Sequence, residues 1–232
     1  THLEAGRPKM DAIFKLAKKH NAAVLILTID EDGMAKTVER KLEIAKRIYD
    51  IATKEFGLRP EDLVYDTLTF PLSTGDPEFA NSALATIESI KRIKEELPGV
   101  FTSLGVSNVS FGLSKAARPV LNSLMLYHSV QAGLDMAIVH ASKIKPYPEI
   151  PSEEREIIND LIFNKHPDAL QKVIEFYEGV QVIDEKHKNP TEDMTSEEAL
   201  YWSILNRFKE GLESAIDEVV HRDGPGSQDD KA

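Results

Sequence analysis

The sequence contains no cysteine in its 232 residues, which excludes disulfide frameworks, thiolate zinc sites and cysteine nucleophiles. Long apolar runs are missing as well, since none approaches the roughly 20 residues that a membrane-spanning helix needs. The chain opens on Thr1-His2-Leu3-Glu4 and passes straight into a helical pattern, so no secretory leader is recognisable. These absences predict a cytoplasmic protein. The missing initiating methionine also predicts a piece of a longer protein, cut at both ends.

Positive charge is scarce. The chain has 28 Lys and Arg residues against 39 Asp and Glu residues, a net charge of -11. Residues 191–232 are the most acidic part, with 11 acidic and 4 basic residues. A surface that neutralises phosphates needs the opposite sign, so nucleic acid is excluded as a partner. The content of 41% apolar and 29% charged residues is ordinary for a globular protein.

Apolar runs alternate with helical stripes along the first 150 residues. Four runs predict strands that are buried on both faces: residues 22–29, 63–65, 100–106 and 134–139. Apolar residues between them recur at three- and four-residue spacing, which predicts helices buried along one stripe. In the second such helix the inward residues are expected to be Ala83, Leu84, Ile87 and Ile90. The alternation predicts an α/β fold with a parallel sheet, either an open doubly wound sheet or part of a (β/α)8 barrel.

Beyond Pro151 the pattern predicts helices alone. Helices are expected to start at Ser152 and over residues 167–178, and residues 181–195 are polar enough for a linker. A stripe at mostly four-residue spacing then predicts one long acidic helix, with Leu200, Ile204, Phe208, Leu212, Ile216 and Val219 on its apolar side. The Gly- and Pro-rich residues 223–227 are expected to end it.

Polar residues stand just past the predicted strand ends, where both candidate architectures place functional groups: Asp30, Asp66, Ser107, Asn108 and His140. The carboxylate of Asp66 can accept hydrogen bonds from the paired N–H groups of an amino-heterocycle. A carboxylate that caps its own loop fits the residues slightly better. The amide of Asn108 offers a donor and an acceptor without charge, which suits a substrate nitrogen that changes its protonation. Stabilising its own turn is the commoner role of such a residue.

Other candidate sites receive less support from the sequence. Residues 30–32 lack the spacing of a calcium loop and are expected to form a solvated acidic loop. The seven histidines show no paired spacing, so no metal site is predicted, and His128 is expected to be a packed histidine. Arg118 is expected at the surface, with a loop carboxylate or an anionic ligand tail as alternative partners. Glycine-rich nucleotide loops and the G-x-S-x-G motif do not occur.

Four segments together resemble the pterin-binding barrel of the cobalamin-dependent methionine synthases. They are residues 27–35 (LTIDEDGMA), 66–70 (DTLTF), 104–113 (LGVSNVSFGL) and 133–139 (GLDMAIV). The same barrel occurs in methyltetrahydrofolate:corrinoid methyltransferases and, more distantly, in dihydropteroate synthases. The resemblance covers residues 1–179 and implies the C-terminal half of a (β/α)8 TIM barrel, followed by helices. Thr1 resembles the last residue of the family's fourth strand.

The resemblance also implies roles for matching residues. Asp66 would bind the N–H groups of the pterin ring of 5-methyltetrahydrofolate, and Asn108 would bond the nitrogen that carries the methyl group. Ser107 would support that loop, and Thr28 would belong to the substrate site. The family has Asn-Pro where this chain has His140 and Ala141, but a histidine there can still donate a hydrogen bond.

The implied partners lie outside this chain. In the family the methyl group passes to cobalamin on one further domain and to homocysteine on another. Residues 1–180 would be a partial barrel, residues 181–195 a linker, and residues 196–232 the start of a helical cap over cobalamin. The D-x-H-x-x-G motif of the corrinoid domain is absent, so no stable cobalamin binding is expected. A stand-alone methyltetrahydrofolate:corrinoid methyltransferase and a non-catalytic half-barrel that binds a separately encoded half are the alternatives.

Overall fold

A computed structural model of the chain describes residues 1–4, 6–180, 190–209 and 211–220. Contacts divide the chain into two units, Thr1–Val180 and Gln181–Ala232. The first unit contains a four-stranded parallel sheet of β1 (Val24–Leu27), β4 (Leu63–Asp66), β5 (Phe101–Gly105) and β6 (Met136–Ile138), in that order. Its helices are α1 (Arg7–His20), α2 (Val38–Asp50), α3 (Ser82–Glu96), α4 (Ala117–Gln131), α5 (Ser152–Ile162) and α6 (Ala169–Phe176). The predicted α/β class is therefore confirmed, and the strand order is that of part of a (β/α)8 barrel.

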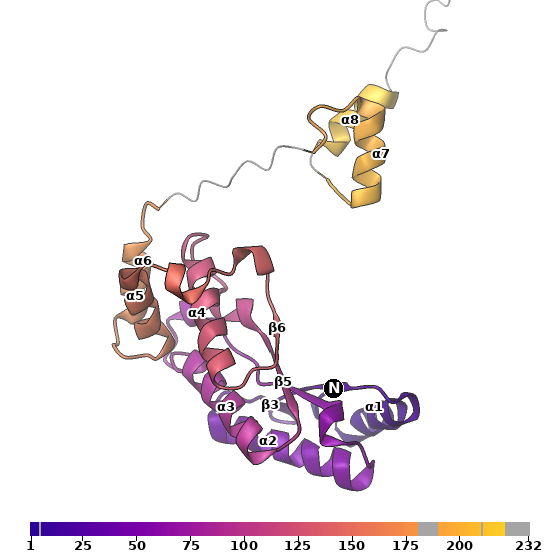
Figure 1. Ribbon diagram of the computed structural model, residues 1–232, viewed down its shortest axis with the longest axis vertical. Coiled ribbons are helices and arrows are strands. Elements are labelled where there is room, and N and C mark those ends of the chain that lie inside the picture. Colours follow the sequence, from indigo (N-terminus) through magenta and orange to yellow (C-terminus); the bar gives the residue numbers. More distant parts are fainter. Residues whose placement is uncertain (5, 181–189, 210, 221–232) are drawn as a thin grey trace, which may run out of the picture. The chain divides into compact units, whose positions relative to one another are not determined.

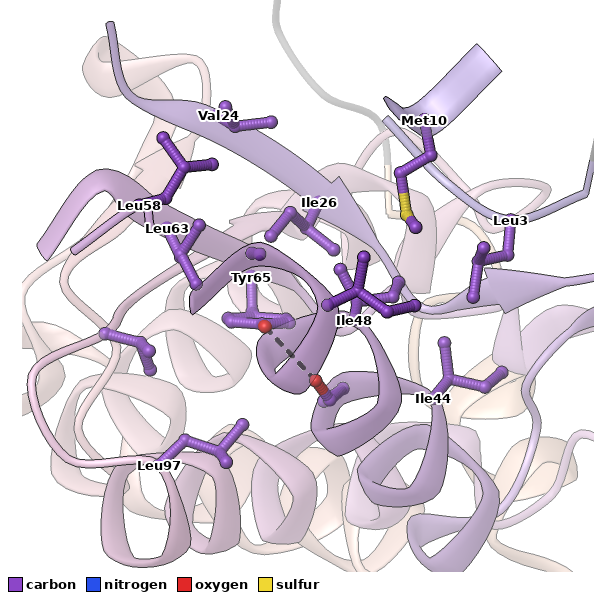
Figure 2. Packing of buried hydrophobic residues seen from close by; sticks show 14 of the residues in the cluster. Leu3, Met10, Val24, Ile26, Ile44, Ile48, Leu58, Leu63, Tyr65 and Leu97 are labelled. Atoms are coloured by element: carbon purple, nitrogen blue, oxygen red, sulfur yellow. Dashed lines mark hydrogen bonds between the residues drawn. The ribbon is translucent and has the colours of Figure 1, made fainter. Parts of the chain in front are cut away.

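Neighbouring helices of the first unit pack against one another in chain order, from α2 to α6 (Figure 1). Two clusters of buried side chains lie beneath them. In the first cluster Tyr65 is central, with Ile26 and Ile48 among its labelled neighbours (Figure 2). The Tyr65 hydroxyl donates to the carbonyl oxygen of Ala45 over 3.1 Å, so its polar end is satisfied inside the core.

The two faces of the sheet differ in burial. Side chains alternate between faces along a strand, and Val24, Ile26, Leu63 and Tyr65, on the helix-covered face, are all buried. On the other face Leu25 is 42% exposed and Ile138 is 65% exposed. We call this second face the open face. The sequence prediction of strands buried on both sides is wrong here, because the described residues provide helices for one face alone.

The first strand is shorter than predicted and leads into a small hairpin. Ile29–Asp30 (β2) and Gly33–Met34 (β3) pair antiparallel. Asp30 is buried and forms an ion pair with Arg40 of α2, and Arg40 also bonds Asp32 over 2.8 Å. The expected solvated acidic loop is therefore wrong for Asp30, because a cation on the next helix compensates the buried carboxylate.

The first residues are not helical, contrary to the sequence prediction. The N–H of Leu27 donates to the Thr1 carbonyl over 2.8 Å, and the N–H of Leu3 donates to the Ile29 carbonyl over 3.0 Å. Residues 1–3 therefore run beside β1 as extended chain, and α1 begins only at Arg7.

Two further expectations about burial fail. Leu84 of α3 is exposed, while Ala83 and Ile90 are buried as predicted. The whole of β6 is exposed, since it forms the edge of the sheet and no following helix of the described residues covers it. None of the described helices is long and apolar enough to cross a membrane.

The second unit contains two short helices where one long helix was predicted. They are α7 (Ser196–Asn206) and α8 (Leu212–Val220), and they pack against each other. Arg207 adopts a left-handed conformation with φ 54° and ends α7, while the Thr195 side chain caps its start. Residues 181–189 of the predicted linker at 181–195 and the predicted stop at residues 223–227 lie outside the described residues.

Candidate functional site

The carboxyl ends of the parallel strands bring Thr28 and Asp66 into contact. Thr28 follows β1 and is fully buried, and Asp66 is the last residue of β4. The carbonyl oxygen of Asp66 accepts the Thr28 N–H over 3.3 Å and the Thr28 hydroxyl over 3.4 Å. Two of the predicted site residues therefore lie side by side at the carboxyl ends of the neighbouring strands β1 and β4.

The Asp66 side chain belongs to the open face. It lies level with Leu27 on β1 and Ser103 on β5, and it is only 7% exposed. Its Oδ1 accepts the backbone N–H of Leu68 over 2.8 Å. Burial raises the pKa of the Asp66 carboxyl, while the Leu68 N–H and the amine of Lys41 act in the opposite direction. A desolvated carboxylate at this position can bind N–H donors of a ligand strongly, because little water competes.

The loop after Asp66 contains polar groups that the sequence analysis did not single out. The hydroxyls of Thr67 and Thr69 are buried and have no hydrogen-bond partner among the described residues. Lys41 of α2 is also fully buried and donates to the carbonyl oxygen of Leu68 over 2.9 Å. A signal for Lys41 was present, since it occupies the same helical stripe as the buried Ala45 and Ile48.

Asn108 lies in the 3₁₀ turn Val106–Ser110, directly after β5, and its side chain is exposed. A Cβ atom on Gly105 would approach the Asn108 side-chain nitrogen to 3.3 Å, so the small residue leaves room for the amide. Ser107 is half-buried, and its carbonyl accepts the Ser110 hydroxyl over 3.1 Å. Within the described residues no hydrogen bond joins Asn108 to Asp66.

A close contact joins the loops that follow β4 and β5. The Ser73 hydroxyl donates to the carbonyl oxygen of Phe111 over 2.5 Å. Gly112 has φ +86°, and a Cβ atom there would lie 2.6 Å from the Ser73 Oγ. Glycine is therefore required on two grounds, conformation and space. This contact ties the Asp66 loop to the Asn108 turn.

His140 follows β6 and is exposed, with its Nδ1 at 3.0 Å from the Ser142 hydroxyl. β6 packs against the Asn108 turn, although no hydrogen bond links His140 to Asp66 or Asn108 in the described part of the chain. The structure thus places His140 at the same end of the sheet without direct contact.

Two other residues that the sequence analysis considered, Arg118 and His128, make contacts that support the fold. Arg118 is half-buried and its Nε donates to the Ser110 hydroxyl over 3.3 Å, so it supports the Asn108 turn and is not the surface residue expected. His128 is a packed histidine, as expected, with its Nε2 at 2.8 Å from Asn159 Oδ1. No cluster of His, Cys, Asp or Glu suited to a metal ion occurs among the described residues.

A pocket of about 460 Å³ exists in this unit, but Asp66 does not line it. Its walls include Ser73, Gly112, Gln171 and Tyr177. The predicted site residues instead stand at or just past the carboxyl ends of the strands.

A parallel α/β sheet with polar groups at the carboxyl ends of its strands is typical of enzymes built on (β/α)8 barrels or on doubly wound sheets. Residues 4–140 match the pterin binding enzyme family, and the chain belongs to that family. The matched segment includes every predicted site residue, from Thr28 to His140.

Two relatives are methionine synthases. The chain is 40% identical over 215 residues to the methionine synthase of Mycobacterium tuberculosis (strain ATCC 25618 / H37Rv), which covers 90% of this chain. It is 39% identical over 216 residues to that of Mycobacterium leprae (strain TN), which covers 91% of this chain. The chain spans 18% of the length of each relative.

Proposed function

We propose that this chain is the part of a cobalamin-dependent methionine synthase that binds 5-methyltetrahydrofolate and presents its methyl group for transfer. The observation that carries the proposal is Asp66, a buried carboxylate at the carboxyl end of β4 and on the open face. It lies inside the segment that matches the pterin binding enzymes. A pterin ring offers adjacent N–H groups on one edge, and a carboxylate accepts two such bonds in parallel.

The two principal side chains have different tasks in this mechanism. Asp66 holds the ring edge, assisted by the buried Thr28 that anchors its backbone. Asn108 faces the ring nitrogen that carries the methyl group, with Ser107 as the neighbouring support and His140 as a further donor. As the carbon–nitrogen bond breaks, the electron pair stays on that nitrogen, which takes up a proton. The amide of Asn108 can hydrogen-bond this nitrogen before and after protonation.

Cobalamin supplies the nucleophile for the methyl group when it is bound, and we assign its binding to a part of the enzyme other than residues 1–180. No residue of the described unit is assigned to hold it, and the D-x-H-x-x-G motif does not occur in the sequence. Homocysteine, the final acceptor, is likewise assigned to another domain. The contribution of this chain is binding and orientation.

The length of the aligned segment favours a methionine synthase over a stand-alone corrinoid methyltransferase. An alignment over 90% of the chain necessarily extends past residue 180 into the second unit. In any placement such an alignment includes α7 (Ser196–Asn206), so this helix belongs to the part that the chain shares with methionine synthases. We propose that residues 196–232 begin the cap over cobalamin and that residues 181–195 are the linker to it.

The test uses this chain co-expressed with the segment of the Mycobacterium tuberculosis methionine synthase that precedes the matched region. We call this preparation the completed barrel. Calorimetric titration with 5-methyltetrahydrofolate should show binding to the completed barrel and much weaker binding to the chain alone, because pockets bury most of a ligand's surface. Equal affinity in the two preparations would contradict the proposal that the folate site of the chain alone is incomplete.

Asp66→Asn should abolish most of the affinity, and Asp76→Asn provides the matched control. Asp76 has the same local geometry, with its Oδ1 accepting the N–H of Glu78 over 2.9 Å, but it is exposed. Substitution of Asp76 should leave folate affinity unchanged. If the two substitutions had equal effects, Asp66 would be a loop-capping carboxylate and not a ligand-binding one.

A further inference from the structure

The side chain of Lys41 is buried in a place where packing does not require an amine. It projects from α2 into the region below the Asp66 loop and is 0% exposed. Its Nζ donates to the Leu68 carbonyl oxygen over 2.9 Å and to the Thr86 hydroxyl over 3.3 Å. Lysine normally keeps its amine in water, and a methionine of similar length would fill the same space without desolvating a charge.

Leu68 connects this amine to Asp66. Its N–H donates to Asp66 Oδ1 over 2.8 Å, while its carbonyl oxygen accepts from Lys41 and from the Thr86 hydroxyl, the latter over 2.8 Å. Leu68 has φ 56°, a left-handed conformation that a leucine rarely adopts without support. The two donors on its carbonyl provide that support.

We propose that Lys41 is a positioning residue of the pterin site: its amine fixes the Leu68 carbonyl, so that the Leu68 N–H stays on the Asp66 carboxylate. The inference rests on the proposed function and extends it to a residue that does not touch the ligand.

The electrostatic setting agrees with this role. Burial lowers the pKa of Lys41 to about 7, and the negative charge of Asp66 acts in the opposite direction. Reciprocally, Lys41 lowers the pKa of Asp66 against the larger effect of burial. The other groups that face the amine are neutral, namely the Thr86 hydroxyl and the Phe70 ring at 6.0 Å. In the acid range where a carboxyl titrates, Lys41 therefore carries its proton.

The first measurement follows the Asp66 carboxyl by carbon NMR in the completed barrel without folate. Asp66→Asn assigns the resonance. Lys41→Met should raise the pKa of Asp66 and shift the amide resonance of Leu68. Ile44→Val, a buried substitution on the same helix, is the control: it should destabilise the protein and leave both signals unchanged. An Asp66 titration that is identical in Lys41→Met and in the unsubstituted protein overturns the proposal.

A second variant keeps the test decisive if Lys41→Met does not fold. Thr86→Val removes one donor to the Leu68 carbonyl and keeps the amine and its charge. It should shift the Leu68 amide resonance while changing the pKa of Asp66 less than Lys41→Met does. If Thr86→Val leaves the Leu68 amide and the folate affinity unchanged, the supporting contacts have no positioning role and the proposal fails.

Folate titration separates this proposal from the proposed function. Lys41→Met should weaken 5-methyltetrahydrofolate binding about tenfold, the effect of one charge-supported hydrogen bond. If no variant binds folate but Lys41→Met still moves the Asp66 titration, the pterin assignment fails and the positioning role stands. If folate binds and the Asp66 titration does not respond to Lys41, the positioning role alone is wrong.

Discussion

Replacing Asn108 and replacing Asp66 in the completed barrel should change folate affinity and the rate of methyl transfer to different degrees. Asn108 is proposed to bond a nitrogen whose protonation changes during transfer, so its contribution grows toward the transition state. Asn108→Ala should therefore lower the single-turnover rate of transfer to free cob(I)alamin by roughly tenfold to a hundredfold, since one neutral hydrogen bond in a dry site is worth on the order of 1–3 kcal/mol. Folate affinity should fall less.

Asp66→Asn is the comparison for this experiment. It removes a charge that favours the ring N–H groups in ground and transition states alike, so binding should suffer at least as much as rate. The same pair of measurements, equilibrium titration and single turnover, reports both quantities. Intact single-turnover rates in Asn108→Ala, with weakened binding, would make Asn108 a residue that only orients the substrate.

The burial of Asp66 also predicts an effect on stability. Its folded pKa is raised above the value of 3.8, so its stabilising contribution is complete below pH 3.8 and is lost as the pH rises through the folded pKa. Asp66→Asn should therefore increase the free energy of unfolding at pH 7, and this gain should vanish toward pH 3. Urea unfolding at the two pH values measures it. A loss of stability at pH 7 would mean that the attraction of Lys41 outweighs desolvation.

The sequence could predict candidate site residues only where a polar residue occupies a position that is itself informative, such as the end of an apolar strand. The location of Asp66 and Asn108 was predictable because polar residues directly after apolar strands collect at one end of a parallel sheet. Lys41 was not singled out: its position on the buried stripe of α2 was a signal, but a lysine within a helix is usually solvated, and its contact is with Leu68, 27 positions away. Asp30 was misjudged for the same reason, because the cation that compensates it belongs to the next helix.

At the scale of secondary-structure elements, the contact between Ser73 and Gly112 should control how the Asn108 turn sits beside the Asp66 loop. Gly112→Ala forces both a strained φ and a clash with Ser73. Gly33→Ala is the matched control, since Gly33 has φ +101° but no atom within 4 Å of an added Cβ. Gly112→Ala should cost about 1–3 kcal/mol more, measured by urea unfolding, because overpacking is added to strain. If both substitutions lowered the free energy of unfolding equally, the contact between Ser73 and Gly112 would not control the position of the two loops.

The elements were predicted where each one follows its own local pattern. The four strands and the helices α2, α3 and α4 came from apolar spacing that the fold preserves. The break between α7 and α8 was missed because the apolar four-residue spacing continues across the turn at Arg207. The stripe also misled about burial, since Ile204 and Ile216 are exposed while the small residues Ala199, Ser203 and Ala215 are buried. The hairpin of β2 and β3 was too short to show a period.

At the scale of the whole molecule, the open face should make the chain self-associate when it is expressed alone. Exposed apolar residues lie across that face, with Met136 and Ile138 on the edge strand β6. Unpaired strand edges and apolar faces favour association with further chains. Light scattering should report oligomers or aggregates. A monodisperse monomer with a cooperative calorimetric melt would contradict this expectation.

Substitutions can show which surface causes the self-association. Ile138→Lys and Met136→Lys should each reduce the apparent mass, because a buried lysine at the contact would have to be desolvated. Leu84→Lys is the control, since Leu84 is an exposed apolar residue on α3 and not on the open face. If Leu84→Lys reduced association as much, general surface hydrophobicity would be the cause.

The sequential strand order has a consequence for how the protein is made. Each strand of the sheet pairs with the strand that precedes it in the order β1, β4, β5 and β6, and each helix from α3 to α6 packs against the helix before it. A ribosome therefore releases every strand–helix unit next to a neighbour that has already emerged, and no unit has to wait for a distant partner. Each pairing closes one strand–helix segment and not the whole unit, which limits the loss of chain entropy at each step. Translation can thus add strands to this sheet in the order in which they leave the ribosome, from β1 to β6.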